Sequence, residues 1–333
     1  MSALTHAVRF GNRHGVGLVG IVHEPAADRR LDVAVLLLSP GVKNRVAPHR
    51  LYNKMAAPLV EQGYWVFRFD FSGLGDSEGV INEPYLADFY GTVALGRYVT
   101  DTLDAMDWLR GQYPVNRFVL GGLCGGAITG VLAAPQRSDV AGLLGLGLPL
   151  MVEGRNIDQH RNVTAGQLNR LRGQYLKKLA SPRAWVRLLS LRTDWRMAVK
   201  SVVDRKRRPR PAAAGGVPQV PVPGDNANVL FAPAFLQLLE RGCPALLLFS
   251  EMDRLWWEFD EKFLVSHRPA LAKYGTLLEV GIVPGANHTF TLEEWQADMM
   301  SKVGAWFDRH VRPQANRLTS DRLMGLVGPA GPA

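Results

Sequence analysis

Residues 117–130 constrain the fold of this chain more than any other stretch. An apolar run typical of a strand ends in glycines, and a run with helical character follows directly. Cys124 occupies the corner between Gly122 and Gly126, which matches the small-x-nucleophile-x-small pattern of a nucleophile elbow. Flanking glycines let the strand and the helix pack closely around a strained central residue. The amides and dipole of the helix N-terminus would favour a thiolate there, although a buried, inert cysteine is the competing interpretation.

Strand-like and helical segments alternate on both sides of this corner. Besides the segment before Cys124, we expect strands at residues 5–11, 16–23, 32–39, 64–70, 140–148, 244–249 and 277–283. Helices are expected at residues 49–62, 99–109, 128–134, 231–240, 256–271 and 292–311. This alternation implies parallel pairing through right-handed crossovers. The predicted fold class is therefore α/β, with a mostly parallel sheet covered by helices on both faces.

The alternation stops at Pro149 and resumes near residue 229. Residues 151–228 are rich in arginine and contain amphipathic segments, so we interpret them as an inserted, mostly helical cap. Residues 1–150 and 229–311 would then form one core. The last residues, 312–333, are rich in Pro, Gly and Arg, which predicts a flexible C-terminal tail.

Composition narrows the class of protein. A chain of 333 residues can bury a full core, and its two cysteines, Cys124 and Cys243, indicate a reducing, cytoplasmic compartment rather than a disulfide scaffold. The N-terminus lacks the pattern of a secretory signal, and no apolar run approaches the roughly 20 residues of a transmembrane helix. We therefore expect no transmembrane segment. Nothing in the sequence indicates the oligomeric state.

The formal net charge of +9 raises the question of a polyanionic partner. Much of the excess lies in the basic run at residues 205–210, which is typical of a solvated, flexible connection. No nucleic-acid-binding motif accompanies this run, so we expect no nucleic-acid partner. Attachment of the basic cap to an acidic polymer or a membrane surface remains an alternative.

Two loops supply partners for a thiol nucleophile, which needs a base and a group that orients the base. Asp253 follows the strand ending at residue 249, and His288 follows the strand ending at residue 283. The carboxyl ends of parallel strands share one edge of a sheet, so Cys124, Asp253 and His288 are expected to meet there. Glu251 and Asp260 are substitutes for the acid, because Asp253 could instead only cap the next helix. Likewise, His288 could be an ordinary hydrogen-bonded loop histidine.

Acyl chemistry at this site also requires hydrogen-bond donors for a developing oxyanion. The backbone N–H of Gly125 would be one donor, and that of Val42, in the turn after the strand at residues 32–39, would be the other. The glycine-rich loop at residues 71–79 lacks the lysine and the spacing of a phosphate-binding loop, so its glycines indicate tight turns. Asp70 and Ser77 beside it are interpreted as hydrogen-bonding scaffold. We expect no cofactor and no metal.

Four motifs in this order resemble the α/β-hydrolase superfamily: residues 44–52, 68–79, 122–126 and 285–290. Within it, they most resemble the exosortase-A-system-associated hydrolases, which are similar to serine-aminopeptidase-like hydrolases but carry a Gly-Leu-Cys elbow. The resemblance covers about residues 5–311. It implies an α/β-hydrolase fold with Cys124 as nucleophile, Asp253 as acid and His288 as base. It implies no substrate, and the long basic cap and the Ser-Pro-Gly-Val turn depart from the common pattern.

The sequence thus predicts a hydrolase that acts on ester, thioester or lactone bonds through a covalent acyl-cysteine intermediate. Its expected partner is a small-molecule or carrier-bound acyl substrate. An acyltransferase or cyclase that uses the same acyl-enzyme is an alternative, because water, an alcohol or an amine could accept the acyl group. A non-catalytic descendant of the fold that binds a ligand or a partner is another.

Overall fold

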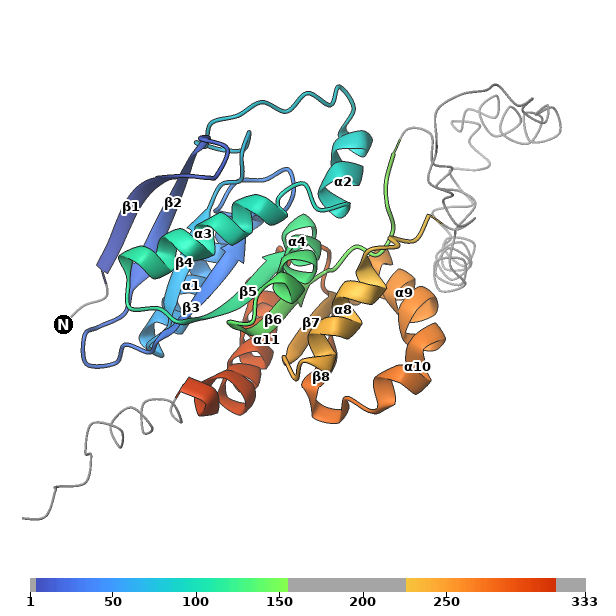
Figure 1. Ribbon diagram of the computed structural model, residues 1–333. Helices are drawn as coiled ribbons and strands as arrows, with labels where there is room; N and C mark the ends of the chain where they lie inside the picture. The colour runs from blue at the N-terminus through green and yellow to red at the C-terminus, as the bar shows by residue number, and fades with distance from the viewer. Residues whose placement is uncertain (1–3, 155–225, 316–333) are drawn as a thin grey trace, which may run out of the picture. The chain divides into compact units, whose positions relative to one another are not determined.

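A single sheet organises the structure, a computed structural model that describes residues 4–154 and 226–315. Its eight described strands lie in the order β1-β2-β4-β3-β5-β6-β7-β8 (Figure 1). The strands are β1 Leu4–Gly11, β2 Gly17–Glu24, β3 Val33–Leu38, β4 Trp65–Phe69, β5 Arg117–Leu123, β6 Val140–Leu146, β7 Ala245–Ser250 and β8 Leu278–Val283. β2 pairs antiparallel with β1 and β4, and the remaining pairs are parallel. The predicted α/β class with a mostly parallel sheet is therefore confirmed.

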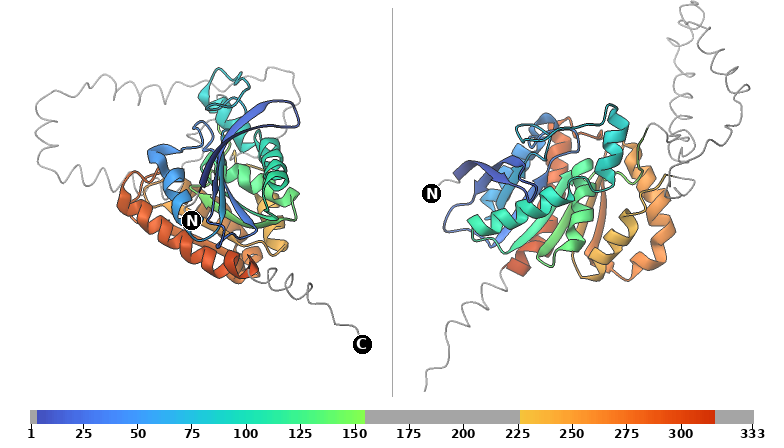
Figure 2. Two further views of the ribbon diagram at one scale, coloured as in Figure 1. Left: turned by 90° about the vertical axis from the view of Figure 1, so that its left-hand side faces the viewer. Right: turned by 45° about the horizontal axis from the view of Figure 1, so that its top comes forward.

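Helices cover both faces of this sheet. They are α1 Leu51–Glu61, α2 Leu86–Ala94, α3 Val99–Gln112, α4 Gly125–Ala133, α8 Phe231–Glu240, α9 Arg254–Phe259, α10 Val265–Ala272 and α11 Glu293–Trp306. Short helical turns are η1 Pro48–Arg50, η2 Ala134–Gln136, η4 Asp260–Leu264, η5 Gly275–Leu277 and η6 Phe307–Val311. Helices lie on both faces of the sheet in Figure 2. Alternate residues of β3 point to opposite faces: Leu36 joins the core with α3, α4 and α8, whereas Val35 joins the core with α1 and α11. The continuous apolar run of β3 is thus buried on both sides.

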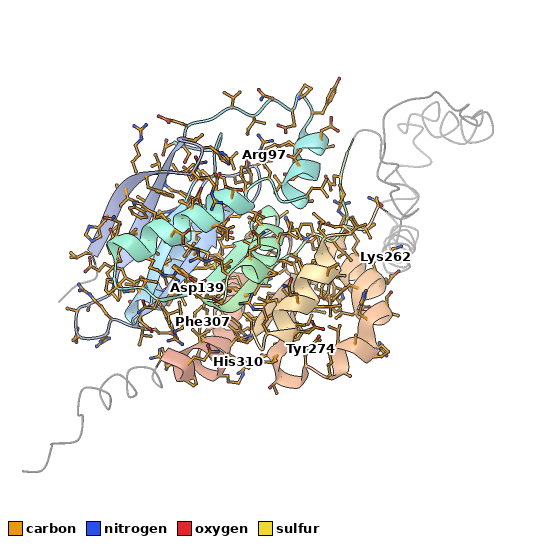
Figure 3. All side chains as sticks on the ribbon, viewed as in Figure 1. Arg97, Asp139, Lys262, Tyr274, Phe307 and His310 are labelled. Atoms are coloured by element: carbon orange, nitrogen blue, oxygen red, sulfur yellow. The ribbon has the colours of Figure 1, made fainter. Side chains whose placement is uncertain are left out.

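The C-terminal helix closes one face. Trp306 is fully buried, and a Cβ atom added to Gly142 of β6 would lie 2.8 Å from its ring. Phe307, labelled in Figure 3, packs edge-on against Tyr64 with ring centroids 5.0 Å apart. Helical structure continues to residue 315, where Ala315 is buried. The start predicted for the flexible tail, residue 312, therefore lies inside a packed helix, and residues 316–333 of that tail are outside the described residues.

Two helices differ from the sequence prediction. The segment before residue 99, for which the sequence predicts no helix, contains α2, whose two turns bury Phe89 and Val93. A stretch this short shows too little periodicity to be recognised from the sequence. α4 begins at Gly125 rather than at residue 128, although glycine is a poor helix former, because tertiary packing outweighs local propensity there.

The chain leaves and re-enters this core at one place. Met151 forms an antiparallel bridge with Ala227, and the Val152 N–H donates to the Asn226 carbonyl over 2.9 Å. Paired ends of this kind are what an inserted segment requires. The interior of the predicted cap, residues 151–228, lies outside the described residues. None of the described helices is long and apolar enough to cross a membrane.

Glycines set how closely α4 approaches β3 and β5. A Cβ atom on Gly126 would lie 2.2 Å from the Leu38 carbonyl oxygen, and one on Gly122 would lie 2.4 Å from the Gly126 carbonyl carbon. Both contacts are with backbone, which cannot rotate away as a side chain can. The sharp turn from β5 into α4 therefore depends on the absence of side chains at these two positions.

Replacing Gly126 with alanine tests this packing. We expect Gly126→Ala to lower the free energy of unfolding by about 3 kcal/mol or more, because the added methyl group forces α4 away from β3. Gly111 in α3 is the matched control, since a Cβ atom there would meet nothing within 4 Å. Gly111→Ala should raise the free energy of unfolding by about 0.5–1 kcal/mol. Urea denaturation measures both, and equal stability of the two variants would contradict the packing argument.

Candidate active site

Cys124 occupies a strained corner between β5 and α4. Its backbone has φ 53° and ψ −115°, a conformation that a residue with a side chain rarely adopts. The corner is held by hydrogen bonds on both sides: the Cys124 N–H donates to the Leu146 carbonyl over 2.8 Å, and the Cys124 carbonyl accepts from the Ala127 N–H over 2.9 Å. The half-buried thiol therefore lies at the first turn of a helix whose leading amides face it.

Asp253 and His288 meet above the carboxyl ends of β7 and β8. His288 Nδ1 and Asp253 Oδ2 are 2.5 Å apart. The other carboxylate oxygen of Asp253 accepts from the Leu255 N–H over 3.3 Å, at the start of α9. Asp253 thus caps a helix and orients the histidine at the same time, so the two interpretations of this residue are compatible.

Backbone contacts hold the two loops in register. The Met252 N–H donates to the Ala286 carbonyl over 3.0 Å, and the Glu251 carboxylate accepts from the Gly285 N–H over 2.7 Å. Glu251, one of the substitute acids, is therefore a loop clamp rather than a partner of the histidine. Asp260, the other substitute, lies in η4 and is absent from the described lining of the cavity around Cys124.

The His288 ring contacts Asp253 and lines the same cavity as Cys124. Burial lowers the pKa of His288. Hydrogen bonding and charge interactions with Asp253 and Cys124 outweigh burial and raise the pKa to about 10. The ring therefore carries its proton at neutral pH. Gly147 leaves room for the ring, since a Cβ atom there would lie 3.3 Å from Nδ1.

The two predicted oxyanion donors lie on adjoining turns. Gly125 lines the cavity beside Cys124, and a Cβ atom on Gly125 would lie only 2.6 Å from Gly41 Cα. Val42 follows Gly41 in the turn but is not itself among the lining residues. Within residues 4–154 and 226–315, neither the Gly125 N–H nor the Val42 N–H has a hydrogen-bond partner. Both amides are therefore available to an anion.

A cavity of about 240 Å³ opens over these groups. Cys124, Asp253 and His288 all line it. Much of the remaining wall is apolar and consists of Val93, Ala94, Ile128, Pro149, Met151 and Leu255. The structure therefore brings the three predicted residues together in one cavity, and their catalytic roles stay predictions.

Three charged side chains, those of Glu153, Arg254 and Glu258, also line the cavity. Arg254 donates a hydrogen bond to Glu153 and forms an ion pair with Glu258, with N and O 3.7 Å apart. Burial lowers the pKa of Arg254, but the two glutamates and Asp253 raise it above its ordinary value. The guanidinium is thus held in place by carboxylates, and it forms a polar end to a largely apolar cavity.

Asp70 anchors the chain beyond the oxyanion turn. Its carboxylate pairs with the Arg45 side chain, accepts from the Arg45 N–H over 2.6 Å, and accepts from the Asp76 N–H over 3.0 Å. The Ser77 hydroxyl donates to the Asp70 carbonyl over 2.7 Å. The prediction that Asp70 and Ser77 are scaffold agrees with these contacts, and the glycine-rich loop is a set of turns around Asp70.

Tyr52 supports the corner in a way that sequence reasoning missed. Its fully buried hydroxyl donates to the Leu38 carbonyl over 2.7 Å and accepts from the Leu123 N–H over 2.7 Å. It therefore links the end of β3, which leads into the oxyanion turn, with the residue before Cys124. Burial raises the pKa of Tyr52 well above its usual range. A tyrosine in an amphipathic helix carries no signal of this role.

The fold and the site define an α/β hydrolase. A family model described as "Serine aminopeptidase, S33" matches residues 33–207, and the chain belongs to this family. Residue 124 of this chain, at the elbow, is a cysteine. A comparison with curated proteins found no match.

Solved structures share the fold at low sequence identity. An esterase from Pyrococcus furiosus is 17% identical, with 92% of this chain and 91% of that chain covered and a TM-score of 0.54. A dienelactone hydrolase from Anabaena variabilis is 15% identical, with 93% and 99% covered and a TM-score of 0.52. An α/β hydrolase from a Penicillium species is 17% identical, with 93% and 99% covered and a TM-score of 0.50. These structural similarities show that the chain has the α/β-hydrolase fold.

Removal of the Tyr52 hydroxyl tests the link between β3 and β5. Tyr52→Phe removes one hydrogen bond from the buried Leu38 carbonyl and one from the buried Leu123 N–H, so we expect the free energy of unfolding to fall by about 1–3 kcal/mol. Alkylation of Cys124 should also change in rate as the corner relaxes. Tyr64→Phe is the control, because the buried Tyr64 hydroxyl has no partner among the described residues. The idea is wrong if both variants unfold at the same urea concentration.

The raised pKa of His288 gives a second test. Asparagine at position 253 keeps the helix cap but removes the negative charge, so Asp253→Asn should lower the pKa of His288 from about 10 toward 6.5. Histidine ring NMR across a pH titration measures this value directly. A His288 that titrates at the same pH in both proteins would contradict the assigned electrostatics.

Protein stability should follow the same titration. A pKa raised by folding contributes stability that is complete below the ordinary value of 6.5 and is lost as the pH rises through about 10. The stability advantage of the wild type over Asp253→Asn should therefore shrink across this interval.

Proposed function

We propose that this chain is an acyl hydrolase that uses Cys124 as nucleophile, His288 as general base and acid, and Asp253 to orient the imidazole. The observation that carries the proposal is the position of His288, which is hydrogen-bonded to Asp253 and lines one cavity with Cys124. The strained elbow presents the sulfur at the N-terminus of α4, where an anion is favoured. The Cys elbow also leads us to place the chain beside the exosortase-A-system-associated hydrolases within its family.

The reaction proceeds in two steps. The Cys124 thiolate attacks the acyl carbon, a sulfur–carbon bond forms, and the carbonyl π electrons move to oxygen, where Gly125 and Val42 N–H groups stabilise the charge. Collapse of this intermediate breaks the bond to the leaving group, which takes the proton of His288. The neutral imidazole then removes a proton from water, and the resulting hydroxide releases the acid and regenerates the thiolate.

The chemistry of the cavity indicates the substrate class. A thiolate attacks thioesters, activated esters and lactones readily, and its acyl-enzyme is itself a thioester. Two of the structural relatives are named an esterase and a dienelactone hydrolase, which favours esters and lactones beside thioesters. A cavity of about 240 Å³ with a largely apolar wall suits a short acyl group. We therefore propose short-chain acyl esters, thioesters or lactones as substrates.

Trapping of the acyl-enzyme tests the proposal. Incubation with a panel of short acyl thioesters and p-nitrophenyl esters should add one acyl mass to the wild type, located by mass spectrometry at Cys124. Cys124→Ala should lose both this adduct and turnover. Cys243→Ala is the control, since burial raises the pKa of the Cys243 thiol to about 12 and keeps it unreactive.

Other outcomes would change the assignment. Labelling that persists in Cys124→Ala would exclude this nucleophile. Absence of an adduct and of turnover in the wild type across the panel would contradict the proposed activity. Transfer of the acyl group to an added alcohol or amine in preference to water would make the protein an acyltransferase.

A further inference from the structure

Tyr90 enters the cavity from α2, the helix that the sequence did not predict. It lies with Val93 and Ala94 on the side of α2 that lines the cavity, together with Cys124 and His288. The mechanism described above does not use this side chain. The phenol hydroxyl of a tyrosine can donate a hydrogen bond to a substrate that is bound beside the nucleophile.

The Tyr90 ring lies against the oxyanion turn. A Cβ atom on Gly41 would lie 3.6 Å from Tyr90 Cε1 and 3.6 Å from Gly125 Cα. The Tyr90 ring and Gly125 therefore both pack near the same side of Gly41. The aromatic ring thus lies close to Gly125 and to the turn that carries Val42, whose N–H groups are proposed to stabilise negative charge.

The Tyr90 hydroxyl is well suited to donate a hydrogen bond. Within the described part of the chain it has no hydrogen-bond partner, although the ring is half-buried. Burial raises the pKa of Tyr90, and the charges of Cys124 and Glu153 raise it further, so the hydroxyl keeps its proton at neutral pH.

We propose that the Tyr90 hydroxyl is a third hydrogen-bond donor to the substrate oxygen on which charge develops, beside the N–H groups of Gly125 and Val42. This inference rests on the proposed acyl chemistry. As the sulfur–carbon bond forms and the carbonyl π pair moves to oxygen, the phenol O–H donates to that oxygen and keeps its own proton. When the carbonyl re-forms, the hydrogen bond weakens again, so no net proton transfer involves Tyr90.

The role predicts a particular kinetic signature. A donor aimed at the charged oxygen stabilises the transition state more than the bound substrate, so its loss lowers kcat and leaves KM nearly unchanged. The loss should be the same for a p-nitrophenyl ester and for an alkyl thioester of the same acid. A tyrosine that instead protonated the leaving group would matter little for p-nitrophenolate, which needs no proton.

Tyr90→Phe is the informative variant because it keeps the ring that packs on Gly41. We expect kcat to fall about 10²-fold for both substrate types, with an unchanged thermal midpoint. Tyr274→Phe is the control: Tyr274, labelled in Figure 3, lies outside the described cavity lining, and its hydroxyl donates to Glu240 over 3.4 Å. This control should retain the activity of the wild type.

A ketone inhibitor provides a readout that needs no turnover. Trifluoromethyl butyl ketone adds to a thiolate and carries negative charge on its former carbonyl oxygen, whereas methyl butyl ketone stays uncharged. Fluorine NMR titration should show weaker adduct formation in Tyr90→Phe by about the same 10²-fold, with methyl butyl ketone competition unchanged. This arm tests Tyr90 even if the hydrolysis proposal fails.

The results that overturn the inference are distinct from those that overturn the proposed function. Equal adduct affinity and equal kcat in wild type and Tyr90→Phe would remove Tyr90 from the oxyanion site while leaving Cys124 chemistry intact. A loss confined to the alkyl thioester would assign the phenol to the leaving group instead. A fall in thermal midpoint with proportionate loss of all activities would make Tyr90 a packing residue.

Discussion

The close approach of α4 to the ends of β3 and β5 is the constraint on which the candidate site depends. Gly122 and Gly126 leave no room for side chains, so the helix begins directly beyond the strand and Cys124 takes a φ of 53°. The same approach presses Gly125 against Gly41. The packing of α4 thus fixes the positions of both the candidate nucleophile and the turn that faces it. Every residue of α4 is buried, and this apolar surface can offset the cost of the strained corner.

The sheet explains why part of the site could be predicted from the sequence. In parallel strands every carboxyl end lies at one edge, so the residues that follow β5, β7 and β8 must be neighbours whatever the details of packing. Cys124, Asp253 and His288 were chosen by that argument, and they line one cavity. Glu251 and Asp260 are substitutes for Asp253 on the sequence alone. The structure places Asp253 against His288 and gives Glu251 a separate contact with the Gly285 N–H.

Residues whose roles depend on side-chain contacts between distant segments could not be predicted in this way. In the sequence, Tyr52 is one apolar position of an expected helix, yet its hydroxyl links the ends of β3 and β5 through hydrogen bonds. Tyr90 belongs to α2, whose two turns show too little periodicity for recognition. The role of Val42 is predicted only from its position in the turn after β3. The contact between Gly41 and Gly125 is what brings this turn close to the elbow. These contacts are set by tertiary packing.

The central claim is that His288 and Cys124 share a proton inside this cavity. The most direct measurement is the rate of Cys124 alkylation by iodoacetamide at neutral pH, compared between wild type and His288→Ala, both in a Cys243→Ala background. If the imidazolium stabilises the thiolate, loss of the ring should slow alkylation by at least about 10-fold. Equal rates in the two proteins would mean that the histidine does not act on the sulfur, and the proposed chemistry would be contradicted.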